Sequence, residues 1–354
     1  MKGVAVVVAM VVAVLAVAEL SARAFSPYLP EALVWSDKST QVKVAQMDRL
    51  ERRHGCVDVA FVGNSMTRDA VDPRTYTASD PQHRSAYNAA LDAATPALLK
   101  RWTLEQVEPR LQPGTVVLGL SSFDLNDNAR IAASALDSYR TATLSRDDFF
   151  GRLQAPFVEH SDLFRYRSEL RDPAEVWAGI QRLRDGERTE RLSADGLDGI
   201  IGPDGEGLSR RPLHYTGSVA MQAFDRAQLL NDFHMGGAQI AAATDLVEQL
   251  RGRGVEVVLL LLPVTRDYVE LHPDGGADFQ RFLVTARRLA ESTGATLVDA
   301  HAWATSDDQF ADTHHRNGEG ARAFSADLPA LLADAGAATP ACSGGSGEAL
   351  APAP

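Results

Sequence analysis

From residue 57 onward the chain alternates between short apolar runs and longer amphipathic stretches. The apolar runs are rich in Val and Leu and cover Val57–Val62, Thr115–Leu120, Val255–Pro263 and Ala295–Ala300. Continuous apolar runs bounded by turn residues are typical of strands that are buried on both faces. We therefore predict a parallel sheet with helices on both sides, a three-layer α/β/α arrangement.

The stretches around these runs have the 3.6-residue periodicity of helices. Helices are predicted over Ser39–Arg53, Thr95–Leu111, Thr244–Gly254, Ala277–Gly294 and Gly318–Gly336. More than 130 residues separate Leu120 from Val255, and residues 128–233 show scattered aromatic and charged residues without a clear strand signal. We expect this stretch to be a mostly helical insertion that caps one edge of the sheet.

The N-terminus is the most apolar part of the chain. Gly3–Ala18 contains no charged residue and follows only Met1 and Lys2. This length lies between that of a signal-peptide core and the roughly 20 residues that span a membrane. An uncleaved transmembrane anchor, a cleaved signal and a buried core helix are all open, and the first two place the remaining chain outside the cytoplasm.

These patterns predict a domain layout for the whole chain. Residues 1–20 form the membrane anchor or signal, and residues 21–53 a linker with a charged helix. Residues 54–336 form the α/β domain, which carries the insertion at 128–233. Residues 337–354 are rich in Gly, Ala, Pro and Ser, and they are expected to be a disordered tail.

The net charge and the cysteines indicate which partners and which redox state are expected. The formal net charge is −12, whereas binding to nucleic acid phosphates needs a basic surface, so nucleic acid is not an expected partner. Cys56 and Cys342 are the two cysteines. In an oxidising compartment they could form one disulfide, but two unpaired thiols remain an equal alternative.

Two polar clusters suggest nucleophilic catalysis. Gly63-Asn64-Ser65 directly follows the first predicted strand, which places Ser65 at the carboxyl edge of the sheet, where open parallel sheets bind ligands. A serine hydroxyl needs an adjacent base, itself oriented by an acid. Asp312 and His315, in the loop before the last helix, have a spacing that lets the carboxylate fold back onto the imidazole. Asn317 is expected to cap the helix that follows.

Together the two clusters resemble the blocks of the SGNH (GDSL-like) hydrolase superfamily. The first block of that family carries the nucleophile as Gly-Asp-Ser or a variant, and its last block reads Asp-x-x-His, followed by Asn and Gly, here Asn317 and Gly320. The resemblance covers about residues 55–335 apart from the insertion. It implies a flavodoxin-like parallel sheet, a Ser65–His315–Asp312 triad, and no cofactor or metal.

The two inner blocks of the family depart from its pattern. Where the second block offers a glycine amide to the oxyanion, this chain has Asn88-Ala89-Ala90, and where the third block reads Gly-x-Asn-Asp it has Ser121, Ser122, Phe123 and Asp124. The oxyanion Asn is therefore missing. The replacement donors, or residues lining the substrate site, are expected among Asn64, the Ser65 and Ala90 amides, Asn88, Ser121, Ser122 and Asn126.

The N-terminal anchor, the insertion and the altered third block are similar to the acyltransferase branch of this superfamily, which includes the membrane-anchored proteins of alginate acetylation and teichoic-acid D-alanylation. The resemblance implies an extracytoplasmic O-acyltransferase or acylesterase that acts on an acylated polysaccharide or cell-wall glycan. It also implies a membrane-bound O-acyltransferase as a partner. A non-catalytic, polymer-binding scaffold with a degenerate site is the alternative.

Simpler readings of the same residues stay open. Ser65 could be a turn serine, and His315 a surface histidine at a helix start. Asp312, His314, His315 and His301 could bind a metal, although no second regularly spaced ligand group accompanies them. Asp124 and Asp127 could act as an acid/base pair, but we expect them to cap the helix that enters the insertion.

Overall fold

The computed structural model describes residues 2–30, 32–33, 35–147, 160–189, 192–303, 306–338 and 340–342. Contacts divide the chain into two compact units. The first unit comprises Met1–Gln41 and Tyr139–Leu192, and the second comprises Val42–Ser138 and Ser193–Pro354. The insertion is thus shared between the units, and the second unit holds the whole sheet.

A five-stranded parallel sheet is the centre of the second unit, with strand order β2-β1-β3-β4-β5. The strands are β1 (Val59–Val62), β2 (Ala86–Asn88), β3 (Thr115–Leu120), β4 (Glu256–Leu261) and β5 (Thr296–Asp299). All residues of β1 and β3 are buried, as their continuous apolar character predicts. The predicted α/β class with a parallel, flavodoxin-like sheet is confirmed.

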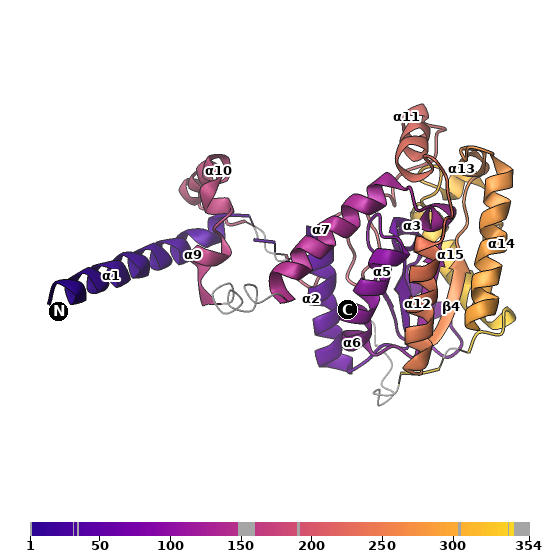
Figure 1. The fold of residues 1–354 in the computed structure, drawn as a ribbon, viewed down its shortest axis with the longest axis horizontal. Coiled ribbons are helices and arrows are strands. Elements are labelled where there is room, and N and C mark those ends of the chain that lie inside the picture. Colours follow the sequence, from indigo (N-terminus) through magenta and orange to yellow (C-terminus); the bar gives the residue numbers. More distant parts are fainter. Residues whose placement is uncertain are drawn as a thin grey trace. The chain divides into compact units, whose positions relative to one another are not determined.

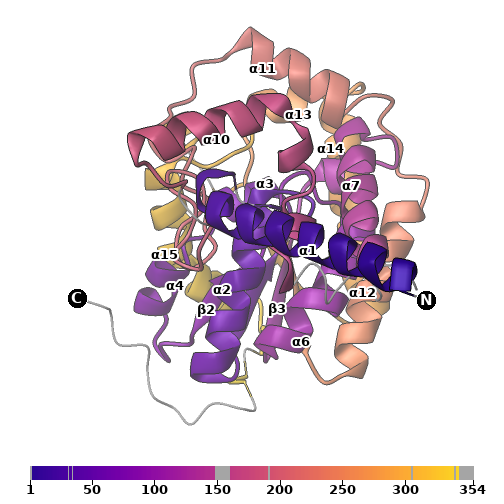
Figure 2. The same cartoon turned by 90° about the vertical axis from the view of Figure 1, so that its left-hand side faces the viewer.

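Helices cover both faces of this sheet (Figures 1 and 2). On one side α15 packs against α3 and α4, and on the other α12 packs against α5 and α14. Their bounds are Ser65–Ala70 (α3), Pro73–Ser79 (α4), Pro96–Trp102 (α5), Ala238–Gly252 (α12), Gly276–Thr293 (α14) and Gly318–Asp334 (α15). The predicted helix over Thr95–Leu111 is one helical stretch, in which a π-helical turn, Thr103–Val107, joins α5 to α6 (Glu108–Leu111). The predicted helix over Ser39–Arg53 is α2 (Lys38–His54).

Strand β2 was missing from the sequence prediction. It has only three residues, Ala-Tyr-Asn, so it shows neither a continuous apolar run nor a measurable alternation. It is specified by tertiary contacts instead, because it pairs with β1 in register, Val59 opposite Ala86 and Phe61 opposite Asn88.

The insertion is helical over most of its described length, as expected. Its helices are α7 (Arg130–Asp147), α9 (Asp162–Arg165), α10 (Pro173–Asp185) and α11 (Val219–Phe224), followed by the π-helical turn Asp225–Leu229. Residues 193–211 differ: they form turns with isolated antiparallel bridges, such as Leu197 with Ile201 and Ile201 with Gly207. These turns contain five glycines, which disfavour regular helix.

The N-terminal apolar segment forms helix α1 (Lys2–Phe25). An 18-residue window within Gly3–Tyr28 has a mean hydropathy of 2.7, and none of this window is buried inside the protein. The buried core helix considered from the sequence is therefore wrong. By length and composition α1 can cross a membrane, and its place near the N-terminus also suits a signal sequence.

A disulfide joins Cys56, just before β1, to Cys342, beyond the last helix, with a Cα–Cα distance of 6.0 Å. The backbone N–H of Cys342 also donates to Asp58 at 2.8 Å. Of the predicted tail, residues 343–354 lie outside the described residues. Disulfides persist in oxidising compartments, so the bond and the apolar N-terminal helix together suggest an extracytoplasmic location.

Breaking this disulfide should destabilise the fold markedly, because the bond closes a loop with a sequence separation of 286 residues and limits the unfolded chain accordingly. Replacing both cysteines by Ala is expected to lower the free energy of unfolding by roughly 2–5 kcal/mol. Urea unfolding with and without reductant measures the effect. The double variant should be insensitive to reductant, and an unchanged midpoint for the reduced wild type would contradict this expectation.

Candidate active site

Ser65 lies at the carboxyl end of β1, in the first turn of α3. Asn64 caps this helix: its Oδ1 accepts from the N–H of Met66 at 2.7 Å. Gly63 is required by close packing, since a Cβ at this position would lie 2.1 Å from Thr67 Oγ1. A strand that ends in Gly-Asn-Ser therefore turns at once into a helix and leaves Ser65 partly accessible at the sheet edge.

His315 and Asp312 meet Ser65 at this edge. The His315 Nε2 lies 2.8 Å from Ser65 Oγ, and the His315 Nδ1 lies 2.8 Å from Asp312 Oδ2. Because a carboxylate only accepts, Nδ1 carries the proton and Nε2 is free to accept from the serine hydroxyl. The backbone N–H of His315 also donates to Asp312 Oδ1 at 2.8 Å, which fixes the turn between the two residues. The structure thus brings together the three residues that the sequence singled out.

The loop that carries His315 is held by the start of α15. Asn317 is the N-cap of this helix, and its Oδ1 accepts from Gly320 N–H at 2.9 Å, as predicted. The Asn317 Nδ2 donates back to the Asp308 carbonyl at 2.6 Å. The histidine therefore sits on a turn tied at both ends, which fixes its ring relative to Ser65.

Asp124 forms hydrogen bonds to the loop that carries Ser65. This fully buried carboxylate accepts from Asn64 Nδ2 at 2.8 Å, and from the N–H and hydroxyl of Ser121 at 2.6 and 2.7 Å. Burial raises the pKa of Asp124 to about 7, against the opposing effect of these donors. Asp124 therefore holds the Asn64 side chain that caps the helix of Ser65.

The helix-capping expectation for Asp124 and Asp127 needs a correction. Asp124 completes a capping box with Ser121 in the short 3-10 helix Ser122–Leu125, not in the helix that enters the insertion. Asp127 accepts from Gln239 N–H at 2.9 Å at the start of α12, the helix that leaves the insertion. The loop after β3 is thus hydrogen-bonded to the helix that follows the insertion. Local sequence does not reveal this long-range contact.

The predicted oxyanion donors occupy defined but mostly internal positions. Their side chains form hydrogen bonds within the protein. Asn64 and Ser121 both bond to Asp124, and Ser122 bonds to His272 and Tyr268. Asn88 Nδ2 donates to the backbone carbonyls of Thr67, Arg68 and Val71, and Asn126 Nδ2 donates to those of Leu229 and Asn231. The Ala90 N–H makes a long bond of 3.2 Å to Asn88 Oδ1. Within the described chain no hydrogen bond takes the Ser65 N–H.

A second serine–histidine contact lies deeper in the fold. Ser122 Oγ is 2.8 Å from His272 Nε2, the same separation as in the Ser65–His315 pair. The His272 Nδ1 faces the backbone carbonyls of Tyr268 and Val269, both at 3.1 Å, in place of a carboxylate. Ser122 is fully buried. This pair therefore lacks both the acid and the access that a nucleophile requires.

One residue of the insertion, Arg210, lies next to the acidic residue of the triad. Arg210 Nη1 donates to the buried Asp69 at 2.8 Å, and Arg210 Nε lies 3.5 Å from Asp312 Oδ2. Gly205 lets this segment approach the sheet: its φ is +84°, and a Cβ there would lie 2.1 Å from the Asn88 carbonyl oxygen. Neither Arg210 nor Asp69 was predicted from the sequence. Two consecutive arginines, Arg210 and Arg211, are visible in the sequence. They lie far along the chain from both motifs, so nothing in the sequence connected them with the site.

His314 sits beside His315, with ring centroids 4.0 Å apart. Its Nδ1 lies 2.8 Å from Thr313 Oγ1 and 3.5 Å from Asp225 Oδ2. Burial alone would lower the pKa of His314, but the bond to Asp225 and the charges of Asp312 and Asp225 raise it overall. For His315, burial and the neighbouring His314 lower the pKa to about 4, despite the opposing charge of Asp312. The candidate base is thus neutral at physiological pH.

The pH profile of catalysis should follow from this pKa. A neutral His315 can accept the serine proton, so we expect kcat/KM for a neutral ester to be flat above about pH 5 and to fall roughly tenfold per unit below the pKa. His314→Gln removes the neighbouring positive charge and should move this acid limb upward, toward the ordinary histidine pKa of 6.5. A wild-type limb already centred near pH 6.5 would contradict the expectation.

A metal site was the alternative interpretation of the loop that carries His315. Asp312, His314 and His315 each present a ligand atom within 4.8 Å of the others. His301 does not belong to this group, because its Nδ1 lies 2.5 Å from Asp299 Oδ1 at the end of β5. Both oxygens of Asp312 already accept hydrogen bonds, and the His315 Nε2 faces Ser65. These contacts fit a Ser-His-Asp triad.

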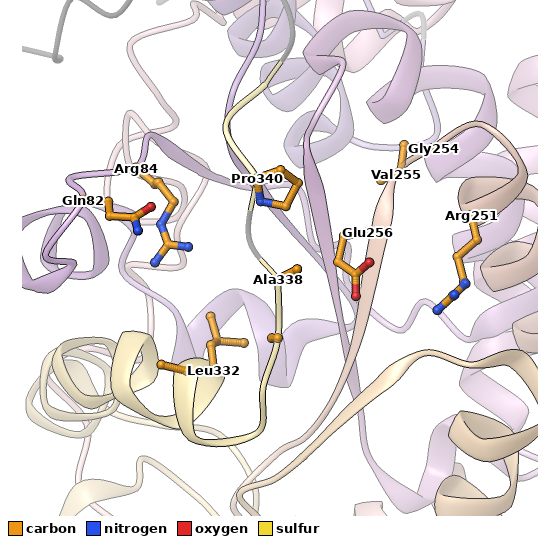
Figure 3. A pocket seen from close by; sticks show the side chains of 11 residues that line it. Gln82, Arg84, Arg251, Gly254, Val255, Glu256, Leu332, Ala338 and Pro340 are labelled. Atoms are coloured by element: carbon orange, nitrogen blue, oxygen red, sulfur yellow. The ribbon is translucent and has the colours of Figure 1, made fainter.

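A pocket of about 600 Å³ lies away from this site (Figure 3). It is lined by the residues before and at the start of β4, by the end of α15 and by the segment that follows α15, including Val255, Glu256, Leu332 and Pro340. Of its two cations, Arg84 and Arg251, Arg84 is bound to Asp80. Parallel sheets bind substrates at the carboxyl ends of their strands, so this pocket, at the amino end of β4, is not the candidate catalytic site.

Comparison with known proteins gives structural likeness only. No family model matches the chain, and no curated protein does. Among solved structures, a GDSL-like lipase from Bacteroides thetaiotaomicron is 11% identical, with a TM-score of 0.37, over 78% of this chain and 86% of its own. A catalytic mutant of an acetylxylan esterase from Geobacillus stearothermophilus is 12% identical, with a TM-score of 0.38, over 79% and 94%. A putative acylhydrolase from Bacteroides fragilis is 12% identical, with a TM-score of 0.38, over 81% and 95%.

Proposed function

We propose that this protein is a serine-dependent acylesterase or O-acyltransferase that acts outside the cytoplasm through an acyl-enzyme at Ser65. The observation that carries the proposal is the line of hydrogen bonds from Ser65 through His315 to Asp312 at the carboxyl edge of the sheet. An activated hydroxyl at an accessible sheet edge suits attack on an ester carbonyl.

In the first half-reaction, Ser65 Oγ forms a bond to the acyl carbon as its proton passes to His315 Nε2. Asp312 holds the Nδ1 proton and stabilises the imidazolium that forms. The tetrahedral intermediate collapses as Nε2–H protonates the leaving alcohol, which breaks the ester bond and leaves the acyl group on Ser65. No cofactor takes part in these steps.

The negative oxygen of the intermediate needs hydrogen-bond donors. The Ser65 N–H is the first donor, since no described hydrogen bond of the protein takes it. The Ala90 N–H is the second, because its long bond to Asn88 Oδ1 can be exchanged for a stronger one to an oxyanion. Two backbone donors resemble the oxyanion hole of serine proteases, so the missing third-block Asn does not exclude catalysis.

In the second half-reaction, water or a sugar hydroxyl gives its proton to His315 Nε2 as its oxygen bonds to the acyl carbon. The second tetrahedral intermediate then collapses: the bond between the acyl carbon and Ser65 Oγ breaks, and Nε2–H returns the proton to Ser65 Oγ. Water yields hydrolysis, and a sugar hydroxyl yields transfer. The proposed substrate is an acylated cell-envelope polysaccharide or glycan, and the proposed partner a membrane-bound O-acyltransferase. Both rest on the resemblance of the sequence motifs, together with the apolar N-terminal helix and the disulfide.

Turnover of p-nitrophenyl acetate by the purified full chain tests the activity, and addition of an unacetylated glycan tests transfer. The proposal predicts nitrophenol release that depends on Ser65, with the acetyl group recovered as acetate or on the glycan. Ser292→Ala is the matched control, because this α14 serine only bonds the Leu289 carbonyl of its own helix. Release that survives Ser65→Ala would overturn the proposal.

A polymer-binding scaffold is the second candidate. One observation favours it: the side chains of Asn64, Ser121, Ser122 and Asn126 are all committed to bonds within the protein, so none is left over as a third oxyanion donor. The intact triad geometry opposes it. Glycan binding that persists in Ser65→Ala, without turnover by the wild type, would establish the scaffold over the enzyme.

A further inference from the structure

Helix α10 (Pro173–Asp185) presents an apolar stripe to solvent. Trp177, Ile180 and Leu183 are 64, 43 and 48% exposed, and they recur at intervals of three residues along one side of the helix. Gly179 is the residue of the helix that is buried. Apolar side chains normally face the protein interior of such a helix, so this arrangement is inverted. A contiguous exposed apolar stripe indicates that something covers it.

The inner side of α10 packs on the residues that directly follow α1 in the first unit (Figure 1). At Gly179 a Cβ would lie 2.8 Å from the Phe25 ring, and 3.2 Å from the Tyr28 carbonyl oxygen. The Arg182 Nε donates to this same carbonyl at 2.7 Å. Phe25 is the last residue of α1. The backbone of α10 therefore touches the very end of the apolar helix.

Helix α9 fixes the same end of α1 from another side. Glu19 accepts from the Ser161 hydroxyl at 2.7 Å and from the Asp162 N–H at 3.1 Å, and Arg23 donates to the His160 carbonyl at 2.8 Å. Leu29, Ala32 and Tyr166 form a small buried cluster beside these contacts. The first unit is thus one packed body built on the end of α1, and α10 is part of it.

We propose that α1 anchors the chain in a lipid bilayer and that α10 lies in the interface of that same bilayer, with Trp177, Ile180 and Leu183 inserted among the lipids. An interfacial region of roughly 5–8 Å lies on each side of the hydrocarbon core, and a helix in contact with Phe25 is within its reach. Tryptophan at the headgroup level and leucine or isoleucine below it are the side chains that such helices use.

Burial of the apolar stripe, and not electrostatic attraction, drives the association of α10 with the bilayer. His160–Thr189 contains six arginines and six acidic residues, so attraction to anionic lipid contributes little. Insertion should therefore occur equally in vesicles of neutral and of anionic phospholipid, and it should persist at high salt. This independence distinguishes α10 from basic amphipathic helices, whose binding weakens as salt rises.

A fluorescent probe on the stripe tests the proposal in the full chain. Ile180→Cys can be labelled with the environment-sensitive dye NBD, since the native cysteines are paired. Val284→Cys is the matched control: Val284, an exposed apolar residue on α14 of the second unit, is 42% exposed. Leu183→Cys provides a second position on the stripe. The proteins are reconstituted into phosphatidylcholine vesicles, and flotation establishes that they are anchored.

We expect blue-shifted emission and at least roughly twofold quenching by lipids that carry a doxyl group near the headgroup for probes at 180 and 183, but not at 284. Three results would overturn the proposal: a chain that does not float with vesicles, water-like emission at 180 and 183, or shielding from iodide without quenching by doxyl lipid. The last result would mean that protein, such as a second copy of the chain, covers the stripe.

Discussion

Ser65→Ala is expected to lower kcat/KM for an acyl ester by at least roughly 10⁴-fold. In the proposed mechanism the hydroxyl carries the acyl group, and removing it also leaves His315 Nε2 without the proton that it is placed to accept, 2.8 Å away. The residual rate should come only from substrate binding and the backbone oxyanion donors. Steady-state kinetics with p-nitrophenyl acetate measures the change.

The variant should fold normally, because Ser65 is partly exposed and its side chain is not part of the core. Circular dichroism and the urea midpoint check this point. Ser292→Ala, on the surface of α14, should retain wild-type kinetics. A Ser65→Ala protein that keeps more than about a tenth of the wild-type kcat/KM would rule out the nucleophile, since triad serines cost far more on removal.

Asp312→Asn is expected to lower kcat by roughly 10³–10⁴-fold while the fold is kept. Asp312 accepts the Nδ1–H of His315, which fixes the tautomer whose Nε2 faces Ser65. The Asn amide can turn its NH₂ toward Nδ1, which favours the tautomer with a proton on Nε2. That tautomer cannot accept the Ser65 proton.

Asp299→Asn is the matched control, because Asp299 also pairs with a histidine: its Oδ1 lies 2.5 Å from His301 Nδ1 at the end of β5. The same chemical change there should leave kcat near the wild-type value. At alkaline pH the loss in Asp312→Asn should persist or ease only slightly, because His315 is already neutral there and the change lies in its tautomer. Equal losses in the two variants would show that the effect is not specific to the triad.

The outline of the fold was predictable because four of the five strands are continuous apolar runs. The prediction for Thr115–Leu120 coincides with β3, and that for Val57–Val62 differs from β1 by two residues at its start. Strand β2 was missed, since three residues carry too little pattern and its place depends on pairing with β1. Local pattern thus identifies the strands that are long enough to show an apolar run, including the edge strand β5, and misses the three-residue β2.

The candidate site was predictable where residues lie on short motifs. Gly63-Asn64-Ser65 and Asp312 to Asn317 each form one compact turn, so their spacing and their resemblance to the SGNH blocks indicated the roles proposed for them. The contributions of Arg210 and Asp225 were not predictable, because each reaches the site from the insertion through contacts made only in the folded chain. The same holds for Asp124, whose carboxylate supports Asn64 across the ends of β1 and β3.

The most direct test of the account is to map the site at which a fluorophosphonate reacts with the full chain. Among the described residues two serines lie 2.8 Å from a histidine Nε2, Ser65 and Ser122, and of these two Ser65 has a carboxylate behind its histidine and access to solvent. Peptide mass spectrometry should find one adduct, on Ser65, and none in Ser65→Ala. An adduct on Ser122, or an unlabelled wild type beside a labelled control esterase, would contradict the account.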